Sequence, residues 1–210
     1  MRCIDLVFPV QGSELPTDHA YPLYAALAGR LPALHNGELS IAIASIGGNY
    51  VGSGKLAVGP HSKLRLRLPV EQIPTVLPLA GSPLEIAGQR LRLGVPRVVA
   101  LIPAPAVVAR LVTIKGFTEP AEFVEAARRQ LDALNVAGEL GIPLIESGTR
   151  AGQPRRRVLR IKGKQVVGYS LQVTGLTAED SITLQEAGLG GRRKLGCGFF
   201  LPLLPRNWSP

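Results

Sequence analysis

Residues 188–198 of the 210-residue chain read Gly188-Leu189-Gly190-Gly191-Arg192-Arg193-Lys194-Leu195-Gly196-Cys197-Gly198. A triplet of glycine, apolar residue and glycine opens this stretch, a second one closes it, and three consecutive cations lie between them. Glycine lets a main chain adopt positive φ and approach a ligand without a Cβ, while adjacent cations attract phosphate. The stretch, which we call the glycine loop, predicts a cradle for a polyanion. A glycine-rich turn with solvated charges is the alternative.

The glycine loop differs from the two common glycine-rich nucleotide motifs. Arg193 stands where a dinucleotide-binding fingerprint requires its third glycine, and no Gly-Lys-Ser or Gly-Lys-Thr follows to make a P-loop. Any polyanion binding is therefore expected from the cations Arg192, Arg193 and Lys194. The backbone of Gly190 and Gly191 is expected to take part as well.

The chain around the glycine loop predicts an α+β unit. Its expected elements are a strand at 107–115, a helix at 119–134, a hairpin at 158–161 and 166–173, a final helix and a closing strand at 198–201. The apolar face of the first helix contains Phe123, Ala127, Leu131 and Leu134. Gly163 is expected to turn the hairpin. Thr177 is expected to cap the final helix, with Asp180 completing a rough capping box.

The first half of the chain predicts the same order of elements. They are a strand at 4–10, a helix that ends at Asn36-Gly37, strands at 39–46 and 63–68, a short helix at 70–79 and strands over 83–93. Asp18 is expected to cap the first helix, and the cations of residues 63–68 are expected on an outer face. The apolar face of that helix contains Leu23, Leu27, Leu31 and Leu34. The order β-α-β-β-α-β is that of a ferredoxin-like unit.

The predicted fold class is therefore α+β, with two tandem ferredoxin-like (RRM-like) units and antiparallel sheets. The units are expected at residues 1–96 and 97–210, and an apolar run with Pro103-Ala-Pro105 is expected to connect them. No sequence repeat relates the two halves, so only their architecture repeats.

Composition narrows the class of partner. A net charge of +9 attracts phosphate, which points to nucleic acid or an anionic membrane. No apolar stretch is long enough for a transmembrane helix, and residues 1–9 lack the apolar core of a signal peptide, so we expect a cytoplasmic protein without a membrane partner. Cys3 and Cys197 lack zinc spacing and are expected to be reduced.

The glycine loop is similar to the signature of the RAMP superfamily of CRISPR-associated proteins, in which two such triplets flank a five-residue spacer before the last strand. Three further segments carry the resemblance: residues 4–35, 109–129 and 157–170. Together they resemble the sixth Cas protein family, the endoribonucleases that cut CRISPR precursor RNA within its repeats. The likeness is greatest to its myxobacterial-type and compact members.

This resemblance implies a metal-independent endoribonuclease without a cofactor. A 2′-hydroxyl would attack the adjacent phosphate and leave a 2′,3′-cyclic phosphate and a 5′-hydroxyl. The implied partners are precursor and mature guide RNA, with other subunits of a CRISPR surveillance complex as further candidates. Two alternatives remain open, namely a non-catalytic RNA-binding RAMP subunit and a basic DNA-binding or ribosome-associated structural protein.

Proton transfer in this reaction suits histidine. His35 lies at the expected end of the first helix, where the resembled family carries its catalytic histidine, and it is the first candidate for general acid or base. His19 at the start of that helix is the second, whereas His61 lies in a loop and is expected to be a surface residue. By the same resemblance Tyr21 and Ser147 are candidate helpers.

Basic residues supply candidate RNA contacts. Lys115 could neutralise the scissile phosphate, and Arg128 with Arg129 falls where compact members carry an arginine-rich helix. The second basic cluster contains Arg155, Arg156, Arg157, Arg160 and Lys162 and is expected to follow phosphates. Aromatic residues are only 5% of the chain, so readout of RNA shape and phosphate is expected rather than base stacking.

Overall fold

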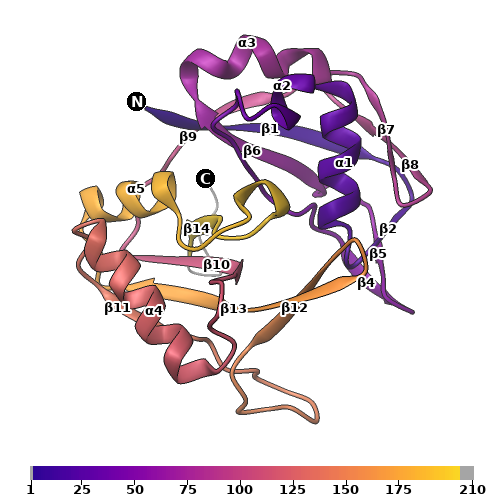
Figure 1. Ribbon diagram of the computed structural model, residues 1–210. Helices are drawn as coiled ribbons and strands as arrows, with labels where there is room; N and C mark the ends of the chain where they lie inside the picture. The colour runs from indigo at the N-terminus through magenta and orange to yellow at the C-terminus, as the bar shows by residue number, and fades with distance from the viewer. Residues whose placement is uncertain (1, 204–210) are drawn as a thin grey trace. The chain divides into compact units, whose positions relative to one another are not determined.

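The computed structural model describes residues 2–203, and contacts divide the chain into two units (Figure 1). The N-terminal unit consists of Met1–Ala100 with Arg160–Lys162 and Lys194–Gly196. The C-terminal unit consists of Leu101–Leu159, Gly163–Arg193 and Cys197–Pro210. In the described part of the chain, no helix is both long and apolar enough to span a bilayer.

The N-terminal unit is built on an antiparallel sheet with β1 near its centre. The strands in spatial order are β3 (Ala42–Ile43), β6 (Lys63–Pro69), β1 (Cys3–Gln11) and β9 (Arg97–Ala100). This is the ferredoxin-like order. The strand β9 corrects one expectation, because residues 97–100 pair with Ile4–Val7 of β1 instead of forming a connection.

Further elements extend this unit. The hairpin of β7 (Pro83–Ile86) and β8 (Gln89–Leu93) pairs with the end of β1, and η1 (Val70–Gln72), α3 (Ile73–Val76) and η2 (Leu77–Leu79) form the short helical segment. A separate small sheet consists of β2 (Glu14–Pro16), β5 (Lys55–Ala57) and β4 (Asn49–Gly52). The strand expected at 39–46 is reduced to the two residues of β3.

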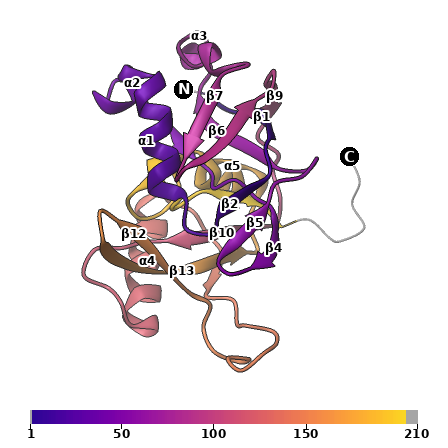
Figure 2. The ribbon, with the colours of Figure 1, turned by 90° about the vertical axis from the view of Figure 1, so that its right-hand side faces the viewer.

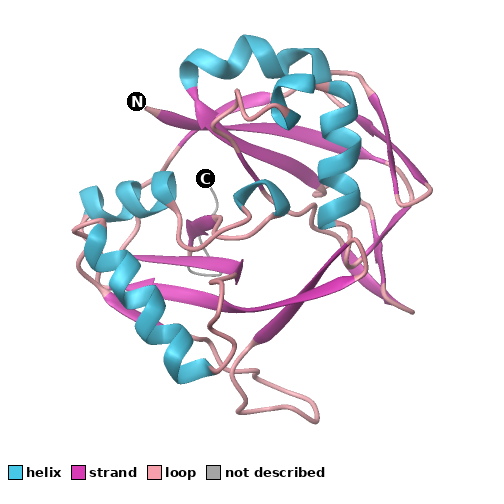
Figure 3. Cartoon of the chain, in the orientation of Figure 1, coloured by secondary structure: helices cyan, strands magenta, loops and turns pink. Residues whose placement is uncertain are grey.

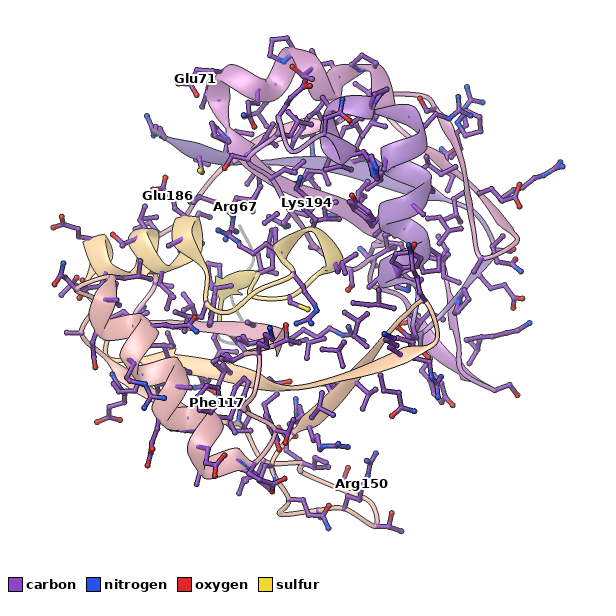
Figure 4. All side chains as sticks on the ribbon, in the orientation of Figure 1. Arg67, Glu71, Phe117, Arg150, Glu186 and Lys194 are labelled. Atoms are coloured by element: carbon purple, nitrogen blue, oxygen red, sulfur yellow. The ribbon has the colours of Figure 1, made fainter. Side chains whose placement is uncertain are left out.

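Arg67 is buried, contrary to the expected outer face of the cations in β6. It lies opposite Asp5 of β1, to which its Nε donates at 2.8 Å and its Nη2 at 3.0 Å, and Arg65 Nη1 donates to the same carboxylate at 2.9 Å. A buried guanidinium is tolerated when it is paired and hydrogen-bonded in this way. Arg67 is labelled in Figure 4.

The helical segment that carries His19 and His35 is interrupted. It forms α1 (Ala20–Arg30) and α2 (Pro32–His35), visible as two helices in Figure 3, instead of one continuous helix. Proline cannot donate a helical hydrogen bond and disfavours helical geometry in the residue before it, and Leu31 indeed has φ −127° and ψ 89°. The predicted apolar face is confirmed, because Leu23, Leu27, Leu31 and Leu34 are all buried in the core.

The C-terminal unit repeats the ferredoxin-like order. Its sheet runs β11 (Glu139–Gly141), β13 (Lys164–Thr174), β10 (Ala106–Val112) and β14 (Phe200–Pro202), and β12 (Arg156–Ile161) also pairs with β13. The helices α4 (Pro120–Ala133) and α5 (Ala178–Ala187) belong to the same unit. Phe123, Ala127 and Leu131 are fully buried against the sheet, as predicted. Thr177 caps α5 by accepting a hydrogen bond from Asp180 N at 3.1 Å.

Candidate nucleic-acid interface

Gly190 and Gly198 of the glycine loop allow close packing within the C-terminal unit. A Cβ on Gly190, which has φ +73°, would lie 2.5 Å from Thr113 O, and one on Gly198 would lie 2.2 Å from Leu189 O. Both positions therefore exclude any side chain. Gly191 differs, because it is exposed and has open space around it, while its N–H donates to Thr113 O at 3.0 Å.

The cations of the glycine loop have different partners. Arg193 Nη1 donates to Glu186 O at 2.7 Å and to Ala187 O, so this guanidinium caps the C-terminal end of α5. Arg192 is exposed and makes one long contact, from Nη1 to Thr113 Oγ1 at 3.4 Å. Arg192 is therefore the more available of these two arginines for a ligand.

His35 is exposed at the last residue of α2. Lys194, which groups with the N-terminal unit, donates from Nζ to Leu34 O at 2.9 Å. An ammonium group has three donors, and this bond occupies one of them. A cation therefore lies beside the helix end that presents the imidazole (Lys194 is labelled in Figure 4).

His19 occupies a very different environment from His35. Its residue is only 1% exposed, its Nδ1 lies 2.7 Å from Pro16 O, and its Nε2 accepts the Ile46 N–H at 3.1 Å. These partners place the ring hydrogen on Nδ1. The imidazole thus joins two backbone segments inside the N-terminal unit. Tyr21, the candidate helper on α1, is half-buried.

The two basic residues of α4, Arg128 and Arg129, also differ in their environments. Arg128 Nη1 donates to Gly138 O at 2.8 Å, which fastens this half-buried residue to its own unit. Arg129 is exposed, and its guanidinium carbon lies 5.6 Å from the centre of the Phe117 ring. Arg129 is therefore the member of the pair that a ligand can reach. Lys115, in the turn after β10, is exposed as well.

Most of the second basic cluster lines a pocket of about 320 Å³ in the C-terminal unit. Its lining residues are Ile145, Glu146, Ser147, Arg150, Arg155, Arg156 and Arg157. Ser147, the predicted helper, belongs to this pocket and is exposed. Arg160, in contrast, is absent from the lining, and its backbone N–H donates to Asp18 Oδ2 at 3.1 Å. Asp18 therefore does not cap α1.

Two further arginines, Arg110 and Arg150, contribute to this charge. Burial lowers the pKa of Arg157, and the positive charges of Arg110, Arg155 and Arg150 lower it further. Arg110 follows the buried Ala109 on β10 and is exposed, so alternation along that strand could have identified it. Arg150 lies in a loop without periodicity, and nothing in the sequence pattern distinguishes it.

Arg110 also connects the pocket electrostatically with the glycine loop. Burial raises the pKa of the Cys197 thiol to about 11, against the lowering effects of a hydrogen bond with Thr113 and of the charges of Arg192 and Arg110. Arg110 therefore acts on groups at both places, Cys197 in the loop and Arg157 in the pocket. We refer to Arg192, Arg110 and the pocket arginines, which all belong to the C-terminal unit, together as the basic track.

The described chain contains two ferredoxin-like units and a glycine loop before the last strand, as its resemblance to the RAMP superfamily implied. The family model described as Cas6 Crispr matches residues 4–204. The CRISPR-associated endonuclease Cas6 of Myxococcus xanthus (strain DK1622) is 47% identical over 202 residues, which cover 96% of this chain and 82% of that protein. The chain belongs to the Cas6 family, and the resemblance noted in the sequence is confirmed.

Solved structures agree with this assignment at the level of fold. One of a CRISPR-associated protein Cas6 has a TM-score of 0.63 at 12% identity and covers 97% of this chain and 99% of that one. One of an RAMP protein that binds different RNA substrates has a TM-score of 0.64 at 11% identity and covers 96% and 99%. The fold is therefore retained across large sequence differences.

Proposed function

We propose that this protein is a metal-independent endoribonuclease that binds CRISPR repeat RNA and cleaves it to produce guide RNA. Membership of the Cas6 family and the basic track both support this proposal. The observation that carries the assignment of the chemistry is the exposed His35 at the end of α2, beside the ammonium group of Lys194.

The cleavage needs two proton transfers. A base removes the proton of the 2′-hydroxyl as its oxygen attacks the adjacent phosphorus, and an acid protonates the departing 5′-oxygen. The P–O bond to that oxygen breaks, which leaves a 2′,3′-cyclic phosphate and a 5′-hydroxyl. We assign one of these transfers to His35. His19 is assigned to folding, because both of its ring nitrogens already have backbone partners in a buried site.

Lys194 supplies the positive charge that the reaction requires. Negative charge increases on the phosphate oxygens as the 2′-oxygen attacks, and a cation held in place stabilises that charge. The bond to Leu34 O fixes the ammonium group and leaves two of its donors for phosphate. Tyr21 is the remaining candidate helper in the same unit.

RNA is held mainly through its phosphates. The available cations Arg192, Arg129 and Lys115, together with the arginines of the pocket, are proposed to contact the backbone, with Gly191 allowing close approach at the glycine loop. Arg193 and Arg128 act indirectly, since each donates to a backbone carbonyl of the protein.

Single-turnover cleavage of repeat RNA in a chelator tests this function. We expect products with 5′-hydroxyl and 2′,3′-cyclic phosphate ends. His35→Ala is expected to bind the RNA like the parent protein and to cut it about 10²–10⁴-fold more slowly, because it lacks one proton-transfer group. His61→Ala is the matched control, since His61 is another exposed histidine and should leave the rate unchanged.

A substrate with sulfur in place of the bridging 5′-oxygen identifies which proton His35 transfers. A thiolate leaves without protonation, so this substrate restores the rate of His35→Ala if His35 is the acid and leaves the defect intact if it is the base. Binding of repeat RNA without any cleavage by the parent protein would instead favour a non-catalytic RAMP subunit. Equal affinity for repeat RNA, scrambled RNA and duplex DNA would favour a basic structural protein.

A further inference from the structure

The arginine-lined pocket of the C-terminal unit is formed by a loop and the strand that follows it. Residues 142–155 join β11 to β12, and Figure 2 shows this loop extending away from the sheet of its unit. Hydrogen bonds across the loop close it: Ile145 N donates to Gln153 O and Arg155 N to Pro143 O, each at 2.9 Å. Arg155 Nη2 donates to Leu144 O at 3.2 Å. The pocket wall is therefore held in place by hydrogen bonds within the loop.

Positive charges outnumber negative charges in the lining of this pocket. Four guanidinium groups line it together with a single carboxylate, that of Glu146. Within residues 2–203 no ion pair involves any of these four arginines. Arg157 Nε is buried and lacks a hydrogen-bond partner among the described residues. A buried unpaired donor costs free energy, and so does the mutual repulsion of like charges. An anion in the pocket would relieve the repulsion.

The size and chemistry of the pocket indicate which anion it takes. A volume of about 320 Å³ is roughly ten times the share of one water molecule in the liquid, which leaves room for more than a bare phosphate group. Guanidinium groups bind phosphate oxygens in a forked geometry, and the hydroxyl of Ser147 adds a neutral donor. No histidine lines the pocket, so the pocket residues provide binding without the proton transfers of cleavage.

We propose that this pocket is a phosphate-binding subsite that holds one nucleotide unit of the RNA away from the bond that is cut. Its role in RNA binding rests on the proposed function, whereas its affinity for phosphate does not. The phosphate can be an internal phosphodiester or a terminal monoester, because both offer the same oxygens to the arginines.

Calorimetric titration of the free protein tests the subsite directly. The probes are two 2′-deoxy dinucleotides of the same sequence, one with a 5′-phosphate and one with a 5′-hydroxyl. We expect one molecule to bind per protein and the double variant Arg150→Gln, Arg157→Gln to bind about tenfold more weakly or worse. Equal affinity of the two probes assigns the site to an internal phosphodiester. Preference for the phosphorylated probe assigns it to a terminal monoester.

The control variant lacks the same number of positive charges as the pocket variant, but at another place in the protein. Arg90→Gln with Arg92→Gln removes two exposed arginines of β8, in the N-terminal unit, and should bind the dinucleotides like the parent protein. Equal weakening by the control variant would reduce the effect to net charge and overturn the subsite. Thermal unfolding of both variants verifies that they are folded, and Arg150→Gln alone, on the exposed loop, is the reserve variant.

Cleavage of repeat RNA separates the subsite from the proposed function. The pocket variant should need about tenfold more protein for half-maximal cleavage and reach the same rate constant at saturation. Arginine-dependent dinucleotide binding by a protein that never cuts repeat RNA would leave the subsite standing and refute the proposed function. Normal cleavage of repeat RNA, together with unchanged dinucleotide binding by the pocket variant, would refute the subsite and leave the proposed function standing.

Discussion

His19 and His35 show how far a residue type determines a role. The sequence identifies both as candidates for proton transfer because an imidazole suits that chemistry. What separates them is burial and hydrogen bonding to Ile46, a residue distant in the sequence, and no local pattern reports such a contact. The position of His35 at a helix end was predictable from the apolar repeat that precedes it.

The structural role of His19 leads to a prediction about stability. His19→Ala leaves the Ile46 N–H and Pro16 O without partners in a buried site, so the free energy of unfolding should fall by about 1–3 kcal/mol for each unpaired group. Urea denaturation measures this change, and His61→Ala should stay within about 0.5 kcal/mol of the parent protein. Parent-like stability combined with lost cleavage would return His19 to the chemistry.

At the scale of elements, local patterns predicted α4, its buried face and the cap of α5, because each depends on residues within a few positions of one another. Local sequence patterns failed where pairing with a distant strand determines the secondary structure. The strand β9 has mostly exposed residues and exists through its pairing with β1. Residues 39–46 alternate like a strand, yet only Ala42 and Ile43 pair with β6. The separation of α2 from α1 could have been predicted from Pro32.

The glycine loop predicts different outcomes for its two neighbouring arginines. Arg193→Ala removes the donor to Glu186 O and Ala187 O at the end of α5, so it should lower the free energy of unfolding by about 1–3 kcal/mol. Arg192→Ala should leave stability unchanged and weaken RNA binding. Thermal unfolding measures the stability of both variants, and filter binding measures their affinity for RNA. A variant of Arg193 that is fully stable but loses RNA affinity would contradict the capping role.

For the whole molecule, a charge of +9 was enough to predict an anionic partner, and the glycine loop pointed to the family. Composition does not show which arginines remain available. In the folded chain Arg67, Arg128 and Arg193 donate to groups of the protein itself, while Arg110 and Arg150 are added to the surface charge. These assignments depend on tertiary contacts.

The salt dependence of RNA affinity tests this division of charge. Each phosphate contact that is lost should reduce the magnitude of the negative slope of log affinity against log salt by about 0.7 to 0.9. Replacing Arg155, Arg156 and Arg157 with Ala should flatten the slope for matched and scrambled hairpins alike. Replacing Arg128 and Arg129 should narrow the difference between those hairpins by about 1–3 kcal/mol if Arg129 contacts a base edge. Equal losses of affinity for both hairpins would indicate that Arg129 contacts phosphate instead of a base edge.

The loop of residues 142–155 has an evolutionary consequence. It is closed by its own hydrogen bonds, and none of residues 143–155 belongs to either hydrophobic core. Substitutions on exposed loops of this kind usually cost little stability, whereas Gly190 and Gly198 cannot be replaced because neighbouring backbone leaves no space for a side chain. Evolution can therefore exchange the loop arginines Arg150 and Arg155 at little cost in stability while the scaffold stays constant.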